Sequence, residues 1–92
     1  MIVIPSMATY TIVIEKRAER ELRRLPLAIQ RRVTQAITSL ADNPHPHRSK
    51  KLGGWQHRWR IRIGDYRVVY EVHEQVLRIM VIRIGHRRDV YR

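Results

Sequence analysis

The pattern of apolar and polar residues predicts a strand followed by two helices in the first half of the chain. Residues 8–15 are rich in Thr, Ile and Val, which favours a β-strand. Residues 16–25 and 27–41 carry apolar side chains at helical spacing, and Pro26 separates the two segments. We therefore expect two short amphipathic helices, antiparallel to each other, after the first strand.

In the second half the apolar period becomes two, which is typical of strands. The pattern predicts three strands, at residues 55–63, 66–73 and 76–84, with Gly64-Asp65 as a hairpin turn. Residues 44–54 contain two prolines and two glycines and indicate a loop. The last strand is almost wholly apolar, so we expect it to be central, and Gly85 is expected to end it.

This order of elements, β-α-α-β-β-β, predicts an α+β fold in which a helical hairpin packs on one face of a mainly antiparallel sheet. The chain has 92 residues, enough for one small domain, which we assign to residues 8–92. Residues 1–7 are apolar but short and precede a second methionine, Met7. They are expected to form a flexible N-terminal extension.

The composition adds a strong charge imbalance. The formal net charge is +11, and only three of the 19 basic residues are lysine, the others being arginine. Guanidinium groups stay charged and bind phosphate in a bidentate way, so nucleic acid or a ribonucleoprotein is the expected partner. A solvated basic surface, or one neutralised by an acidic protein, would have the same composition.

Other features exclude several classes of function. The chain has no cysteine, which excludes disulfides, iron–sulfur clusters and thiol nucleophiles. No apolar run is long enough to span a membrane, and no signal peptide is recognisable, so the expected location is the cytoplasm. His45, His47 and His57 lie in or beside a loop without the spacing of metal ligands, and no metal site is expected.

Strand alternation predicts a face rich in arginine. If the apolar residues of segment 55–63 face the helices, then Arg58, Arg60 and Arg62 face away from them, and Arg67 of the next strand joins them. Arginines that converge without acidic neighbours form an anion site and can stabilise the charge of phosphoryl transfer. The same pattern is also compatible with arginines that only solvate an exposed face.

Several segments resemble the RelE branch of the RelE/ParE toxin superfamily: ELRRLP at the end of the first helix, KLGG, WRIRIGDYRVVYEV, and VIRIGHRRDVYR. The resemblance covers nearly the whole chain from residue 8. It implies a RelE-like fold and a cytoplasmic toxin that a cognate RelB-type antitoxin holds inactive. The implied activity is cleavage of messenger RNA in the ribosomal A site by attack of the substrate's 2′-hydroxyl, with neither a metal nor a cofactor.

The resemblance also implies roles for individual residues. Its catalytic positions fall on Arg60, Arg62, Arg67, Arg87 and Tyr91. The flanking basic residues expected to bind RNA are Lys50, Lys51, Arg58, Arg83 and Arg88. The best-known members have lysines where this chain has Arg60 and Arg62, and arginine is not usefully deprotonated. The general base is therefore expected to be Tyr91 or His86. Histidine is the side chain whose ordinary pKa suits proton transfer.

Two functions of other classes remain open from the sequence. The first is a ParE-like inhibitor of DNA gyrase, which would share the fold but act by binding. The second is a non-catalytic module that binds RNA or the ribosome, for which the charge alone would suffice.

Overall fold

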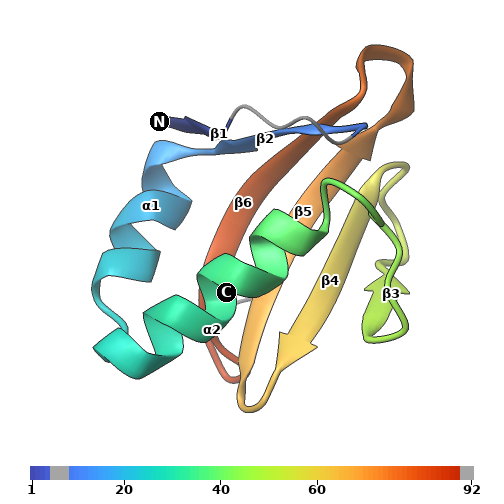
Figure 1. Cartoon of the computed structure of the whole chain (residues 1–92). Helices are drawn as coiled ribbons and strands as arrows, with labels where there is room; N and C mark the ends of the chain where they lie inside the picture. Colours follow the sequence, from blue (N-terminus) through green and yellow to red (C-terminus); the bar gives the residue numbers. More distant parts are fainter. Residues whose placement is uncertain (5–8, 90–92) are drawn as a thin grey trace.

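The structure is a computed structural model, and it describes residues 1–4 and 9–89. Two helices lie against one face of a six-stranded sheet (Figure 1). The elements are, in chain order, β1 (Ile2–Ile4), β2 (Thr11–Ile14), α1 (Lys16–Arg23), α2 (Leu27–Ser39), β3 (Ser49–Lys51), β4 (Arg58–Ile63), β5 (Tyr66–His73), the 3₁₀ turn η1 (Glu74–Val76) and β6 (Arg78–His86). The predicted α+β class is confirmed.

The strands lie in the order β1-β2-β6-β5-β4-β3, and only β2 and β6 run parallel. The remaining neighbours pair in an antiparallel way, as predicted. The apolar strand β6 lies between β2 and β5, which confirms its expected central place. No helix among the described residues is long and apolar enough to cross a membrane.

Both predicted helices form, and each buries one face. Ala18 and Leu22 of α1 and Val33 and Ile37 of α2 are buried in the core. Pro26 stands between the helices, where the carbonyl oxygen of Pro26 accepts the Gln30 N–H at 2.9 Å. Proline suits this position because the first helical turn has no internal partner for its N–H groups.

The loop predicted over residues 44–54 contains a strand that the pattern does not reveal. The edge strand β3 pairs with β4, with Ser49 opposite Ile61 and Lys51 opposite Trp59. Its three residues are polar and have no apolar alternation. This strand therefore forms through backbone pairing with β4, and the pattern of its side chains gives no sign of it.

The N-terminal residues also differ from the expectation of a flexible extension over residues 1–7. Residues 2–4 form β1, which pairs with β2 so that Ile2 lies opposite Ile14 and Ile4 opposite Ile12. Ile2 and Ile4 pack against the core while Val3 is exposed. Apolar burial and ladder hydrogen bonds hold these residues on the sheet. Residues 5–8 lie outside the described residues.

The last strand differs from its prediction at both ends. Between the predicted strands 66–73 and 76–84 lies the 3₁₀ turn η1, followed by Leu77 at φ 51°, so β6 begins only at Arg78. At the other end the strand continues through Gly85, which was expected to break it. Gly85 pairs with Arg67 in the ladder, so backbone pairing extends β6 to His86.

Helix α1 covers the part of β6 that β2 leaves unpaired. Strand β2 reaches only residues 78–81 of β6. Beyond them, the Ile84 N–H donates to Glu21 Oε1 at 3.0 Å, and Arg83 Nε donates to the two oxygens of the same carboxylate at 3.1 and 3.3 Å. A single glutamate of α1 thus binds a backbone donor at the sheet edge and the side chain beside it.

Among the described residues, Tyr70 is the tyrosine that is buried in the core. Tyr70 of β5 is fully buried, and its hydroxyl donates to the Pro44 carbonyl oxygen at 2.7 Å. Burial raises the pKa of Tyr70 to about 12, so the hydroxyl stays protonated and serves as a donor. This bond ties the loop after α2 to the middle of the sheet.

Candidate nucleic-acid interface

Strand β4 divides its side chains between the two faces of the sheet. Ile61 and Ile63 are buried under the helices, at 0% and 3% exposure. Arg60 and Arg62 alternate with them and therefore lie on the face that the helices leave open. The predicted arginine side of this strand is present.

Four cations meet on this open face, and we call Lys50, Arg60, Arg62 and Arg67 the cationic face. Lys50 of β3 lies directly opposite Arg60, and Arg62 lies directly opposite Arg67 of β5. Within the described part of the chain, neither Arg60 nor Arg62 has a carboxylate partner. Like charges directly opposite each other destabilise a sheet, so this arrangement favours an anion as its partner.

The turn between β4 and β5 positions the arginines at one end of this face. Gly64 takes φ 59°, a left-handed conformation that favours glycine, and closes a two-residue hairpin with Asp65. Arg67 donates to the carbonyl oxygens of Gly64 at 3.2 Å and Tyr66 at 3.1 Å. The Arg87 N–H donates to the Asp65 carbonyl oxygen at 2.8 Å, which holds the start of the C-terminal segment beside the same turn.

A groove of about 370 Å³ continues the cationic face toward the sheet edge. It is lined by His47, Arg48, Ser49, Lys50, Arg60 and Arg62. The apolar pattern of the sequence does not indicate that His47 and Arg48 belong to this surface. Both residues directly precede β3, and the pairing of β3 with β4 places them beside Arg60 and Arg62. The apolar pattern of the sequence does not predict this strand.

Two of the arginines expected to bind RNA are engaged inside the protein. Arg58 Nε donates to Glu71 Oε2 at 3.0 Å, and its guanidinium lies 3.7 Å over the Trp55 ring. Arg83 is bound to Glu21, as described above, and is only 16% exposed. An RNA phosphate would have to compete with these carboxylates.

Two other predicted residues, His86 and Lys51, lie on the opposite side of the sheet from the cationic face. His86 pairs with Tyr66 on the helix-bearing side, where their rings meet edge to face at 5.8 Å, so the sheet separates His86 from Arg62 and Arg67. Lys51 lies opposite Trp59, also on that side, and Arg88 is exposed after β6. Tyr91 lies outside the described residues. Among the residues that the structure describes, no group is placed to hold a metal ion.

Comparison with known proteins identifies the family of this chain. Residues 12–91 match the family model described as ParE toxin of type II toxin-antitoxin system, parDE. The chain belongs to this toxin family. Curated relatives assign it to the RelE type: it is 30% identical to Toxin RelG of Mycobacterium tuberculosis over 88 residues, covering 90% of this chain and 97% of RelG. It is 32% identical to Toxin RelE of the same organism over 84 residues, covering 90% of this chain and 87% of that toxin.

Solved structures of RelE toxins share the fold. The archaeal RelE–RelB complex from Pyrococcus horikoshii matches with a TM-score of 0.78 and 31% identity, over 89% of this chain and 99% of that one. The RelB–RelE complex from Methanococcus jannaschii matches with a TM-score of 0.71 and 25% identity, over 86% of this chain and 94% of that one. The expected RelE-like fold is confirmed.

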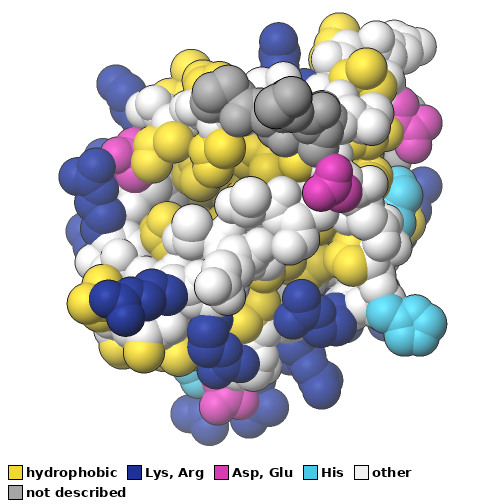
Figure 2. All heavy atoms as spheres, in the orientation of Figure 1, with side chains coloured by type: hydrophobic (Ala, Val, Ile, Leu, Met, Phe, Trp, Pro, Cys, Tyr) yellow, Lys and Arg dark blue, Asp and Glu magenta, His cyan; other side chains and the backbone are white. Residues whose placement is uncertain are grey.

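Basic side chains also lie on the helix-bearing side of this RelE-type toxin. In Figure 2 the lysine and arginine side chains gather along the left and lower margins, around an apolar centre. The lower margin corresponds to the end of the sheet where β4 turns into β5 and where β6 ends (Figure 1). Basic side chains therefore lie at this end of the sheet on the helix-bearing side as well.

We expect Glu71→Gln to destabilise the toxin at neutral pH. Partial burial acts to raise the pKa of Glu71, but hydrogen bonds from His73 and Arg58 outweigh it and bring the pKa below its ordinary value of 4.5. A lowered pKa contributes stability above the unfolded value that is lost as the pH falls. The variant should lose about 1 kcal/mol of unfolding free energy at pH 7. In urea titrations this deficit should shrink as the pH falls below the ordinary value of 4.5 and through the lowered folded-state pKa. A deficit that stays the same in acid would contradict the prediction.

We expect Arg62→Gln to stabilise the toxin. The substitution removes one of two like charges that lie directly opposite each other, which should raise the unfolding free energy by about 0.2–0.5 kcal/mol. Urea denaturation at low salt measures the gain, and added salt should shrink it because salt screens exposed charges. Arg31→Gln, on the exposed side of α2, is the matched control. A loss of stability at low salt would show that Arg62 has a structural role.

Proposed function

We propose that this toxin is a ribosome-dependent endoribonuclease that cleaves messenger RNA in the A site. The observation that carries the proposal is the cationic face, where Lys50, Arg60, Arg62 and Arg67 lie together without the helices covering them. Membership of the RelE type supports it. The domain is small and its open face is shallow, so the ribosome supplies much of the positioning of the substrate.

The proposed reaction uses the RNA's own 2′-hydroxyl. Its oxygen forms a bond to the adjacent phosphorus while the bond from phosphorus to the 5′-oxygen breaks, leaving a 2′,3′-cyclic phosphate and a 5′-hydroxyl. A base takes the 2′-hydroxyl proton, and an acid gives a proton to the leaving 5′-oxygen. Arg62 and Arg67 are proposed to bind the phosphate, with Arg60 and Arg87 neutralising the charge that grows on its oxygens.

The proton transfers are proposed to involve Tyr91. Arg60 and Arg62 remain charged at any working pH, so they act through electrostatics and not as bases. His86 is the alternative base, but the Tyr66 contact keeps its ring on the other side of the sheet from Arg62 and Arg67. For this reason we rank Tyr91 first, and Tyr91→Phe is the variant that should lose activity more than His86→Ala.

We propose that a RelB-type antitoxin neutralises the toxin. The similar structures from P. horikoshii and M. jannaschii are complexes of RelE with RelB. An acidic segment of such a partner would complement the net charge of +11 and block the cationic face. Ribosomes and messenger RNA place the proposed site of action in the cytoplasm.

The matching family model is named for ParE toxins, which makes gyrase inhibition the second candidate. The ends of a defined messenger should be mapped after incubation with purified toxin, with and without programmed ribosomes. The proposal predicts cuts at A-site codons only when ribosomes are present. A parallel reaction with DNA gyrase and plasmid tests for double-strand breaks. Intact messenger together with broken plasmid would replace our proposal with the ParE activity, and protection of RNA without cuts would indicate a passive binder.

A further inference from the structure

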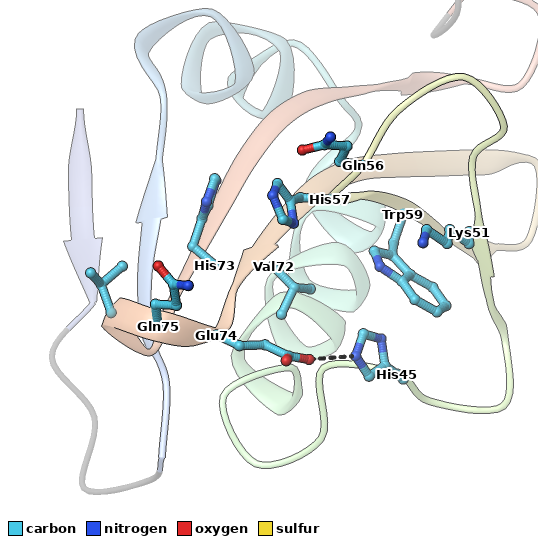
Figure 3. A pocket seen from close by; sticks show the side chains of 10 residues that line it. His45, Lys51, Gln56, His57, Trp59, Val72, His73, Glu74 and Gln75 are labelled. Atoms are coloured by element: carbon cyan, nitrogen blue, oxygen red, sulfur yellow. Dashed lines mark ion pairs between the residues drawn. The ribbon is translucent and has the colours of Figure 1, made fainter.

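A second pocket, of about 490 Å³, lies at the opposite end of strands β4 and β5 from the Gly64-Asp65 turn. The start of β4, the end of β5, the turn η1 and the loop before β3 all contribute to it (Figure 3). Its volume falls in the range of pockets that bind small organic ligands. The cationic face does not reach it, and none of the pocket's lining residues belongs to that face.

Aromatic rings form the walls of this pocket. His45 packs against Trp59 with ring centroids 4.1 Å apart, and His57 faces His73 at 5.4 Å. Figure 3 shows Val72 between these two ring pairs, where it forms an apolar floor and is 3% exposed. Flat walls around an apolar floor suit a flat aromatic ligand, which would stack on them.

Polar groups at the rim match the edges of a nucleotide. Gln56 and Gln75 carry amides that both donate and accept hydrogen bonds, as the edge of a nucleobase requires. Lys51 supplies a cation beside Trp59 for a phosphate. His45 Nε2 lies 3.8 Å from Glu74, so the single carboxylate of the lining already has a partner.

The edge strand β3 links this pocket to the cationic face. Lys50 and Lys51 are consecutive and therefore point to opposite sides of the sheet, Lys50 beside Arg60 and Lys51 beside Trp59. A single RNA strand that passes over β3 would have cations on both sides of the edge. A base unstacked from that strand would meet the aromatic walls.

We propose that this pocket binds one nucleotide of single-stranded RNA, with the base held between the Trp59 and His57 sides and the phosphate bound by Lys51. Stacking of bases on aromatic side chains is the general mode of single-strand recognition. This proposal rests on the proposed function, because a toxin that cleaves messenger RNA has single-stranded RNA as its substrate. It would give the toxin a contact with the messenger away from the scissile phosphate.

Trp59 itself reports on occupancy. The chain contains two tryptophans, and Trp55 does not line the pocket, so Trp55→Phe leaves Trp59 as the sole indole. The four nucleoside 5′-monophosphates, ribose 5-phosphate and a hexaribonucleotide are titrated into this variant. We expect saturable quenching by at least one mononucleotide, tighter binding of the hexamer, and no quenching by the sugar phosphate. Gln75→Ala and Lys51→Ala, each added to the Trp55→Phe variant, should weaken binding of the mononucleotide about tenfold. Arg31→Ala in the same background should not change it.

Three outcomes would overturn the proposal. The first is no saturable quenching by any mononucleotide. The second is equal quenching by ribose 5-phosphate, which would indicate anion binding without a base. The third is a hexamer that binds no tighter than the mononucleotide, which would assign the pocket to a free nucleotide and not to RNA. Because the titration contains no ribosome, a failure here leaves the cleavage assay to test the proposed function separately.

Discussion

Arg67→Ala is expected to lower the rate of messenger cleavage on programmed ribosomes by about 10²–10³-fold, the cost of removing one preorganised donor from a developing negative charge. Arg67 lies opposite Arg62, and its guanidinium is held by the carbonyl oxygens of Gly64 and Tyr66. It is therefore oriented before the substrate arrives. Single-turnover cleavage of a defined messenger measures the effect.

Two further variants make this result specific. Arg67→Lys keeps the charge but loses the planar fork, so it should recover only part of the rate. Arg31→Ala removes an equal charge from the exposed side of α2 and should leave the rate within about twofold, since a distant exposed charge acts only through the screened field. Equal losses in Arg67→Ala and Arg31→Ala would mean that overall charge matters and the cationic face does not.

Glu21→Ala is expected to cost about 2–3 kcal/mol of unfolding free energy, a large fraction of the stability of a small domain. The Glu21 carboxylate accepts the Ile84 N–H at the unpaired edge of β6 and binds Arg83, and both charged side chains are at most 20% exposed. Alanine would leave a partly buried backbone donor without this acceptor and Arg83 without this carboxylate.

Urea denaturation tests this prediction through the midpoint at unchanged slope. Glu21→Gln is the matched control, because its amide oxygen can still accept the Ile84 N–H while the charge is lost. It should lie between wild type and Glu21→Ala. The exposed neighbour variant Arg20→Ala should change the free energy by less than about 0.5 kcal/mol. A Glu21→Ala variant as stable as Arg20→Ala would mean that α1 does not secure the edge of β6.

The sequence predicted those elements that bury side chains periodically. The two helices each bury one face, with Ala18 in the first and Val33 in the second, and β4 buries Ile61 and Ile63. Burial of one face produces a periodic pattern of apolar residues, and this pattern can be recognised in the sequence. The strands β1 and β3 have three residues each, which is too short for a period of two to be recognised. In addition, β3 is wholly polar and forms through backbone pairing, and hydrogen bonds of the backbone have no side-chain period.

The candidate site was predictable to the same extent. Alternation placed Arg60, Arg62 and Arg67 on one face, because side chains of a strand alternate by geometry alone. It could not show that Arg58 is bound to Glu71 or Arg83 to Glu21, since these contacts join distant segments. His86 is instructive: its place beside Arg87 suggested a shared site, but His86 is the last residue of β6 and pairs with Tyr66 on the helix-bearing side.

We expect stability and activity to conflict on the cationic face. Arg62 lies opposite a like charge, and its removal is expected to stabilise the fold while it impairs cleavage. A bound phosphate would reverse the balance, because the anion neutralises both guanidinium groups. The loss of cleavage would distinguish a binding site from a merely solvated surface, whose residues should affect stability alone.

Attack by the 2′-hydroxyl is tested most directly with a messenger that carries a single 2′-deoxy substitution. The substituted nucleotide lies on the 5′ side of the scissile phosphate, in the A site of programmed ribosomes. We expect the unsubstituted messenger to be cut to a 2′,3′-cyclic phosphate and a 5′-hydroxyl, and the substituted one to stay intact at that position. Cleavage of the 2′-deoxy messenger at the same bond and rate would rule out this mechanism, since no internal nucleophile would then be required.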